Sequence, residues 1–395
     1  MNSVHLRSIA QPISVPRPRV GSTSSPAAEP VVDSIDVSYR PQAPNQSFGR
    51  TLATEAFYWT RRVALTLAAP FASLLGMGLG SSPAGLTGAD ELHRQGIDGR
   101  GTRVAVIDQA FTQFGPGQED VLGVYQTRDK TFKPGLEKAK YIPGQETATR
   151  NKPISTHGNA MSAIITGESR GLRGVAPGAE LIGISAIDDK QVLQPELFVE
   201  ALDWVVQNHK EQNIKAVSAS VNYKSPSPEQ REKVQQQVNF LKEQGVAVVV
   251  AAGNRGPEPD SVMFPADLQN VVSVGASTPG WLTGVWDDRV ERYSSRGGEK
   301  LPGPTLLAPG GSVFTKDGHG SVDLTSGSSN STPMVAGAFA LLTQGFPSAS
   351  YEEKIDALTS TARPIKGERE GEGHGVMDLR GAYRKLSETS PPRDS

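Results

Sequence analysis

Apolar positions along this chain follow two patterns that alternate with each other. Mostly apolar runs lie within residues 102–108, 216–221 and 246–251, and such runs are typical of strands buried on both faces of a parallel sheet. Residues 195–213 and 228–244 instead carry apolar side chains every three or four positions, which predicts helices with one buried face. The alternation predicts an α/β fold, with a parallel sheet and helices on both of its faces.

Ser329 lies in a segment that predicts a reactive hydroxyl. Residues 325–337 read Thr-Ser-Gly-Ser-Ser-Asn-Ser-Thr-Pro-Met-Val-Ala-Gly, so Ser329 follows a glycine turn at the start of an apolar helix, with Pro333 in its first turns. Free N–H groups and the positive end of the helix dipole favour the negative charge that develops during acyl transfer. Ser329 is therefore a candidate nucleophile, although capping alone also places Ser and Asn at helix starts.

Asp108 and His157 are candidates for proton transfer. Asp108 ends the first apolar run, and ligands gather at the carboxyl ends of parallel strands, where a lone Asp can also cap the next turn. His157 begins a predicted helix whose buried positions are Met161, Ile164 and Ile165. An imidazole has the side-chain pKa closest to neutrality, which suits a general base. Among the six histidines, only His157 combines a following glycine, a helix start and an apolar face.

The order Asp108, His157 and Ser329, with the sequence around each, resembles that of the subtilisin family of serine proteases. The segment 245–254, which reads Gly-Val-Ala-Val-Val-Val-Ala-Ala-Gly-Asn, is similar to the family's strand that ends at the oxyanion asparagine. The resemblance implies a three-layer fold in which a central, mostly parallel sheet is flanked by helices. It also implies that Asn254 supplies the side-chain amide of an oxyanion hole.

The same resemblance implies a serine endopeptidase that hydrolyses peptide bonds through an acyl-enzyme. Ser329 would be the nucleophile and His157 the base that takes its proton, while Asp108 would orient the imidazole. The alternative is a catalytically weak or inactive relative, which binds peptides in the same place or processes a single partner protein.

The chain departs from the family's pattern next to each of these candidates. Gln109 follows the aspartate where Ser or Thr is usual, Asn159 stands where Thr is usual, and Asn330 stands where Met is usual. None of these changes removes a group that transfers a proton or donates into the oxyanion hole. The effect of the three residues on the rate stays open.

Substrate binding is implied beside two of the predicted strands. The family's Ser-Leu-Gly wall, which borders the residue before the scissile bond, corresponds here to Ser220, Val221 and Asn222. Ala252 and Gly253 complete the candidate substrate-binding set. An extended substrate draws affinity from main-chain hydrogen bonds and specificity from side-chain pockets. A side chain at Asn222 would narrow or roof the entrance, so the sequence leaves the cleavage preference open.

Composition restricts the cofactors and partners. The chain has no cysteine, which excludes disulfides, thiolate-bound metals and a Cys nucleophile. Forty basic and 42 acidic residues give a net charge of -2, so no nucleic-acid partner is expected. The resemblance implies a polypeptide substrate, and a monomer is expected. The chemistry requires no cofactor. No metal site is predicted, and a structural Ca²⁺ stays open because no diagnostic spacing surrounds Asp188, Asp189 and Asp267.

Segments of different composition divide the chain. Residues 1–50 are rich in Pro and Ser and predict a disordered arm, the peptidase domain is expected over residues 86–386, and residues 387–395 form a polar tail. Residues 51–85 predict an apolar helix packed on this domain, with a signal segment or membrane anchor as the alternative. No standard signal peptide or stable membrane span is expected, so the location stays open between secreted and cytoplasmic. Residues 127–149 predict an inserted polar surface loop.

Overall fold

The computed structural model describes residues 82–109, 111, 121–127, 130–134, 157–169, 172–187, 193–278, 288–316, 322–365 and 369–389. The predicted arm at residues 1–50 lies outside the described residues, as do residues 51–81 of the apolar segment and residues 390–395 of the tail. The boundaries expected for these segments and for the peptidase domain therefore stay predictions.

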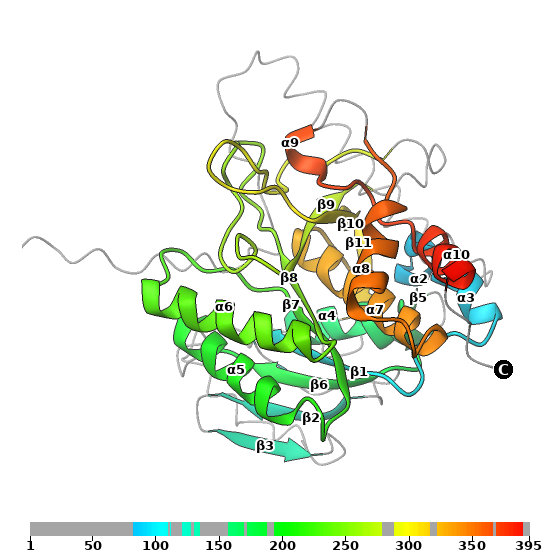
Figure 1. The fold of residues 1–395 in the computed structure, drawn as a ribbon, viewed down its shortest axis with the longest axis horizontal. Helices are drawn as coiled ribbons and strands as arrows, with labels where there is room; N and C mark the ends of the chain where they lie inside the picture. The colour runs from blue at the N-terminus through cyan, green and yellow to red at the C-terminus, as the bar shows by residue number, and fades with distance from the viewer. Residues whose placement is uncertain are drawn as a thin grey trace, which may run out of the picture. The chain divides into compact units, whose positions relative to one another are not determined.

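An eight-stranded sheet forms the centre of the described part of the chain (Figure 1). Its strands lie in the order β10-β9-β8-β7-β1-β6-β2-β3, and all neighbouring pairs are parallel except β2 and β3. The chain winds from β1 toward β2 on one side and from β7 toward β10 on the other, so the winding reverses between β1 and β7. The strands are β1 (Arg103–Asp108), β2 (Val121–Gln126), β3 (Thr131–Pro134), β6 (Glu180–Ser185), β7 (Ile214–Ala219), β8 (Ala247–Ala251), β9 (Val272–Ser277) and β10 (Leu306–Pro309).

Helices cover both faces of this sheet (Figure 1). Helices α4 (His157–Thr166) and α7 (Ser328–Gly345) pack together on one face, and α5 (Pro195–Asn208) and α6 (Pro228–Glu243) pack together on the other. The predicted three-layer α/β class is therefore confirmed. The other described elements are α2 (Pro83–Thr87), α3 (Ala89–Arg94), β4 (Glu168–Ser169), β5 (Leu172–Arg173), β11 (Val313–Lys316), β12 (Val322–Thr325), α8 (Tyr351–Ser360), α9 (Arg369–Glu372) and α10 (Leu379–Thr389).

The side chains of β1 show how the two faces are built. Val104 and Val106 lie in the hydrophobic cluster that contains α4 and α7, whereas Ala105 and Ile107 lie in the cluster that contains α5 and α6. All four side chains are fully buried. Successive side chains of a strand point to opposite faces, so a sheet covered on both sides needs the continuous apolar run that the sequence contains.

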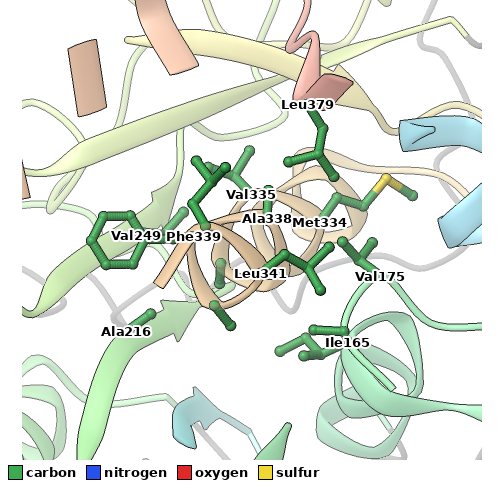
Figure 2. Packing of buried hydrophobic residues seen from close by; sticks show 14 of the residues in the cluster. Ile165, Val175, Ala216, Val249, Met334, Val335, Ala338, Phe339, Leu341 and Leu379 are labelled. Atoms are coloured by element: carbon green, nitrogen blue, oxygen red, sulfur yellow. The ribbon is translucent and has the colours of Figure 1, made fainter. Parts of the chain in front are cut away.

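Helix α7 is buried along nearly its whole length, since 16 of its 18 residues are buried. Figure 2 shows Met334, Val335 and Phe339 of this helix among side chains that come from the sheet, α4 and α10. A helix that is apolar on every side belongs to a protein core. Burial of each large apolar side chain contributes about 1.5–3 kcal/mol, so the core holds the segment that carries Ser329 in place.

One predicted strand begins earlier than its apolar run. Strand β7 covers Ile214–Ala219 rather than residues 216–221, and the helix before it ends at Asn208. The chain turns into the strand at Asn213, which has a φ of 51°. Lys215 interrupts the apolar pattern without leaving the strand, so the hydrophobic signal placed the start too late.

Part of the predicted insertion is regular structure. The structure places residues 131–134 in β3, which pairs antiparallel with β2 at the edge of the sheet. The prediction of a loop over residues 127–149 was wrong for this strand, because an edge strand pairs on one side only and need not be apolar. Residues 135–149 lie outside the described residues.

The end of the predicted apolar segment is a short helix. The hydroxyl of Ser82 accepts the N–H of Gly85 at 3.2 Å and caps α2, in which Pro83 and Ala84 are buried. Helix α2 contacts β5 and β10 of the domain. In the part of the chain that the structure describes, no helix has the length and apolar character needed to cross a membrane.

Candidate active site

A hydrogen bond joins His157 to Asp108 inside the protein. Asp108 ends β1 and His157 begins α4, and Nδ1 of the imidazole lies 2.7 Å from Oδ1 of the carboxylate. The N–H of Gln109 also donates to this oxygen, at 2.7 Å. Asp108 is fully buried and His157 is 7% exposed, so water hardly competes for the bond. The carboxylate favours the tautomer that carries its proton on Nδ1 and its lone pair on Nε2.

Ser329 lies at the same edge of the sheet. It is the second residue of α7, and its main-chain oxygen accepts the hydroxyl of Ser220 at 2.9 Å. Ser220 directly follows β7, whose last residue pairs with the residue before Asp108. The structure therefore brings Ser329, Asp108 and His157 to the carboxyl ends of two adjacent strands, where the winding of the sheet reverses.

Asn254 and Ser329 border the same space beside Gly327. A Cβ atom placed on Gly327 would lie 3.4 Å from Nδ2 of Asn254 and 3.8 Å from Oγ of Ser329. The Oδ1 atom of Asn254 accepts two hydrogen bonds from Ser328, one from the main-chain N at 2.9 Å and one from Oγ at 3.0 Å. Because Ser328 occupies the amide oxygen, the amide nitrogen of Asn254 is the atom turned toward this space.

Gly253 shapes the turn that presents Asn254. Its φ is 112°, a value that a residue with a Cβ atom rarely adopts. Its N–H donates to Oγ of Ser328 at 3.2 Å, and its carbonyl accepts the N–H of Ser295 at 2.9 Å. The chain after β8 is thus held against the first turn of α7.

The polar residues after Ser329 are hydrogen-bonded within the core. Asn330 accepts the hydroxyl of Thr325 at 3.1 Å, and the hydroxyl of Ser331 donates to the carbonyl of Ala308 at 2.9 Å. Buried polar groups that lack partners are costly, whereas these two residues are satisfied by neighbouring strands β12 and β10. The unusual residues that follow Ser329 therefore anchor the first turn of α7.

Tyr223 belongs to the surroundings of Asp108 and was missed by sequence reasoning, because no periodic pattern marks it. Its ring packs on Phe198, with ring centroids 5.6 Å apart. Burial, and then the carboxylates of Asp108 and Glu196, raise the pKa of the Tyr223 phenol well above its usual value. Among the described residues, neither its hydroxyl nor Oδ2 of Asp108 has a hydrogen-bond partner. The phenol therefore presents a dipole rather than a charge to Asp108.

The candidate substrate-binding residues follow β7 and β8 on either side of the start of α7. The side-chain amide of Asn222 donates to the carbonyl of Ala251 at 2.7 Å, so it joins the two segments. Met263, which sequence reasoning did not single out, donates its N–H to the carbonyl of Ala252 at 3.0 Å. The remaining members of the set are buried: Ser220, Val221, Ala252 and Gly253.

Within the described ranges, no group of three or more His, Asp and Glu side chains is arranged to hold a metal ion. Asp267, one of the carboxylates considered for calcium, lies 2.9 Å from the guanidinium of Arg231 in an ion pair. Asp188 and Asp189 lie outside the described residues.

Solved structures share this fold. Fervidolysin from Fervidobacterium pennivorans, a keratinolytic enzyme related to subtilisin, aligns with a TM-score of 0.59 at 22% identity. The alignment covers 74% of this chain and 44% of that one. A psychrophilic protease aligns with a TM-score of 0.57 at 22% identity, covering 71% of this chain and 92% of that protein.

Sequence comparisons name the family. Subtilisin Savinase of Lederbergia lenta is 28% identical over 296 residues, which cover 75% of this chain and 96% of that protein. Subtilisin E of Bacillus subtilis (strain 168) is 27% identical over 298 residues, which cover 74% of this chain and 68% of that protein. The sequence model of the subtilase family matches residues 99–377, which include the strand ends and helix starts described above. The chain therefore belongs to the subtilase family and is a serine-type endopeptidase.

Proposed function

We propose that this protein hydrolyses peptide bonds with Ser329 as nucleophile, His157 as base and Asp108 as the residue that orients the base. One observation carries the assignment. The 2.7 Å hydrogen bond between His157 Nδ1 and Asp108 Oδ1 lies at the end of β1, and Ser329 accepts a hydrogen bond from Ser220 at the end of the adjacent strand β7. Nucleophile, base and orienting group recur in this relation in serine hydrolases of several unrelated folds.

In the first half of the reaction, Oγ of Ser329 attacks the scissile carbonyl carbon while Nε2 of His157 takes the hydroxyl proton. The imidazolium that forms is stabilised by the Asp108 carboxylate. The carbonyl π electrons move to the oxygen, which becomes an oxyanion. When the tetrahedral intermediate collapses, the C–N bond breaks and the amine leaves with the proton from His157, so an acyl-enzyme remains on Ser329.

Two donors are proposed to hold the oxyanion. One is Nδ2 of Asn254, which borders the space beside Gly327 together with Oγ of Ser329. The other is the N–H of Ser329, since helix geometry leaves the first N–H groups of a helix without intrahelical partners. Donors that are already oriented lower the barrier because they need not reorganise as charge develops.

In the second half, a water molecule replaces the amine. Nε2 of His157 takes a proton from the water, the hydroxide oxygen attacks the acyl carbon, and collapse of the second intermediate expels Ser329 Oγ, which regains its proton from His157. The products are a peptide carboxylic acid and an amine, and the enzyme returns to its starting state.

A fluorophosphonate probe tests this assignment, because it forms a covalent bond only with an activated serine. The wild type should be labelled, and Ser329→Ala should not. Ser350→Ala is the matched control, since Ser350 also lies at a helix start but caps α8 by accepting the N–H of Glu353. This control should be labelled like the wild type.

The alternative, a relative that binds peptides without cutting them, makes the opposite prediction. Folded wild-type protein that fails to react with the probe would support it, and labelling that persists in Ser329→Ala would assign the nucleophile to another residue. Circular dichroism on each protein establishes that it is folded.

A further inference from the structure

The two segments beside Ser329 are tied to each other. Asn222, the third residue after β7, donates its side-chain amide to the carbonyl of Ala251 at the end of β8, at 2.7 Å. The bond joins residues 29 positions apart in the chain. Ala251 is fully buried, so its carbonyl would lose a partner in a dry environment if Asn222 moved away.

Met263 lies against the same segment. A Cβ atom placed on Gly253 would lie 3.1 Å from Cγ and 3.2 Å from Sδ of Met263, so the thioether covers the α-carbon of Gly253. The N–H of Met263 also donates to the carbonyl of Ala252 at 3.0 Å, which fixes its position. The side chain of Met263, together with Oγ of Ser295 at 2.8 Å, therefore occupies the place that a larger residue at 253 would need.

The position of the scissile carbonyl decides what meets these side chains. Its oxygen must approach Nδ2 of Asn254, and its carbon must approach Oγ of Ser329. The side chain of the substrate residue that owns this carbonyl branches one atom away. Because residues 220–222 resemble the family's substrate wall, this side chain is expected between that segment after β7 and residues 251–253 at the end of β8.

We infer that Asn222 and Met263 restrict the substrate residue before the scissile bond to small side chains, of the size of Gly, Ala or Ser. The inference rests on the proposed function, because it assumes that the substrate carbonyl lies at Ser329 and Asn254. A Leu or Phe side chain would have to break the bond from Asn222 to Ala251 and displace the thioether from Gly253. A small side chain requires neither change.

Two peptide substrates that differ only in this residue, Ala or Phe, test the inference by their kcat/KM values. The wild type should favour the Ala peptide by at least about tenfold, the scale on which pocket size discriminates. Asn222→Gly and Met263→Ala should each shift the ratio toward the Phe peptide by about tenfold. The matched control is Asn208→Gly, since the Asn208 amide also donates to a main-chain carbonyl at 2.7 Å, that of Trp204 on α5. Its ratio should equal that of the wild type.

Binding separates this inference from the proposed chemistry. The Ser329→Ala variant cannot form an acyl-enzyme, so calorimetry on it measures Kd for product peptides that end in Ala or Phe without any turnover. We expect the Ala peptide to bind at least about tenfold more tightly, and the preference to shrink when Met263→Ala or Asn222→Gly is added. Equal affinity for both peptides, or a preference that survives both substitutions, would overturn the inference whether or not the wild type reacts with the fluorophosphonate.

Discussion

Ser328 donates two hydrogen bonds to one oxygen atom of Asn254, from its main-chain N at 2.9 Å and from its hydroxyl at 3.0 Å. The hydroxyl in turn accepts the N–H of Gly253 at 3.2 Å. Residues next to each of the two proposed reactive groups, Ser329 and Asn254, therefore belong to one hydrogen-bonded unit. Its geometry fixes which end of the Asn254 amide faces the space beside Gly327.

Ser328→Ala should lower kcat by about fivefold and leave KM nearly unchanged. The variant loses the hydroxyl bond to Asn254 and the acceptor of the Gly253 N–H, but it keeps the main-chain bond to Asn254. The bond that orients Asn254 contributes about 1 kcal/mol, which corresponds to the expected change in kcat. The effect appears in kcat because the amide is needed most when the oxyanion forms. Steady-state kinetics on a peptide amide provide the measurement. A change confined to KM would show that Ser328 acts in substrate binding instead.

Asn254→Ala should lower kcat by about 10²–10³-fold, because it removes one of the two proposed oxyanion donors. The fluorophosphonate should still label Ser329 in this variant, although more slowly, since the nucleophile and its base remain. Comparison of kcat with the wild type, together with the labelling rate, provides the test. A kcat within twofold of the wild type would remove Asn254 from the proposed mechanism.

Asp108→Asn should lower kcat by about 10⁴-fold while the fold is retained. The amide has nearly the size of the carboxylate, but it favours the wrong tautomer of His157 and does not stabilise the imidazolium. A melting temperature close to that of the wild type would show that the loss is chemical. If kcat fell by less than tenfold, orientation of His157 by Asp108 would be contradicted.

We expect the free energy of unfolding to depend on pH through Lys354. It is 6% exposed, its Nζ donates to the carbonyl of Ala349 at 2.7 Å, and burial, followed by the charge of Lys215, lowers its pKa from 10.5 to about 8. Between pH 8 and 10.5 the unfolded chain keeps a proton that the folded protein has released. The free energy of unfolding should therefore rise with pH in this window, by up to about 1.4 kcal/mol per pH unit, and stay flat below it.

Urea denaturation of the Ser329→Ala protein, with and without Lys354→Met, measures this dependence free of self-digestion. The Met side chain keeps the length and apolar character of the lysine stem but does not titrate, so the difference between the two proteins isolates Lys354. This difference should grow in favour of the lysine protein as the pH rises through the window. Parallel stability curves would contradict the lowered pKa.

The sequence predicted the positions of the proposed reactive residues because each lies where an element begins or ends. Asp108 ends a strand that must be apolar to bury both faces, and Ser329 begins a helix that must be apolar to fill the core. Hydrophobic patterns mark such transitions directly. The common edge at which these residues meet then follows from the parallel arrangement of the strands.

Contacts between segments that are far apart in the sequence do not produce a hydrophobic pattern. The bond from Asn222 to Ala251 and the contact of Met263 with Gly253 depend on how two segments approach each other after their strands have ended. Neither the spacing nor the apolar character of these residues encodes that approach. The apolar pattern also missed polar residues that belong to strands. Lys215 in β7 and the residues of β3 are held in the sheet by backbone pairing, which apolarity alone does not indicate.

Helix α7 places the proposed nucleophile at one end of a segment whose remaining length fills the core. Surface loops open locally at little cost, whereas displacement of α7 would expose the centre of the molecule to water. A peptidase is itself a polypeptide and a target for other copies of its own chain. Because the proposed nucleophile begins a core helix, a copy that unfolds through its core exposes its chain to cleavage and loses its own ability to cut at the same moment.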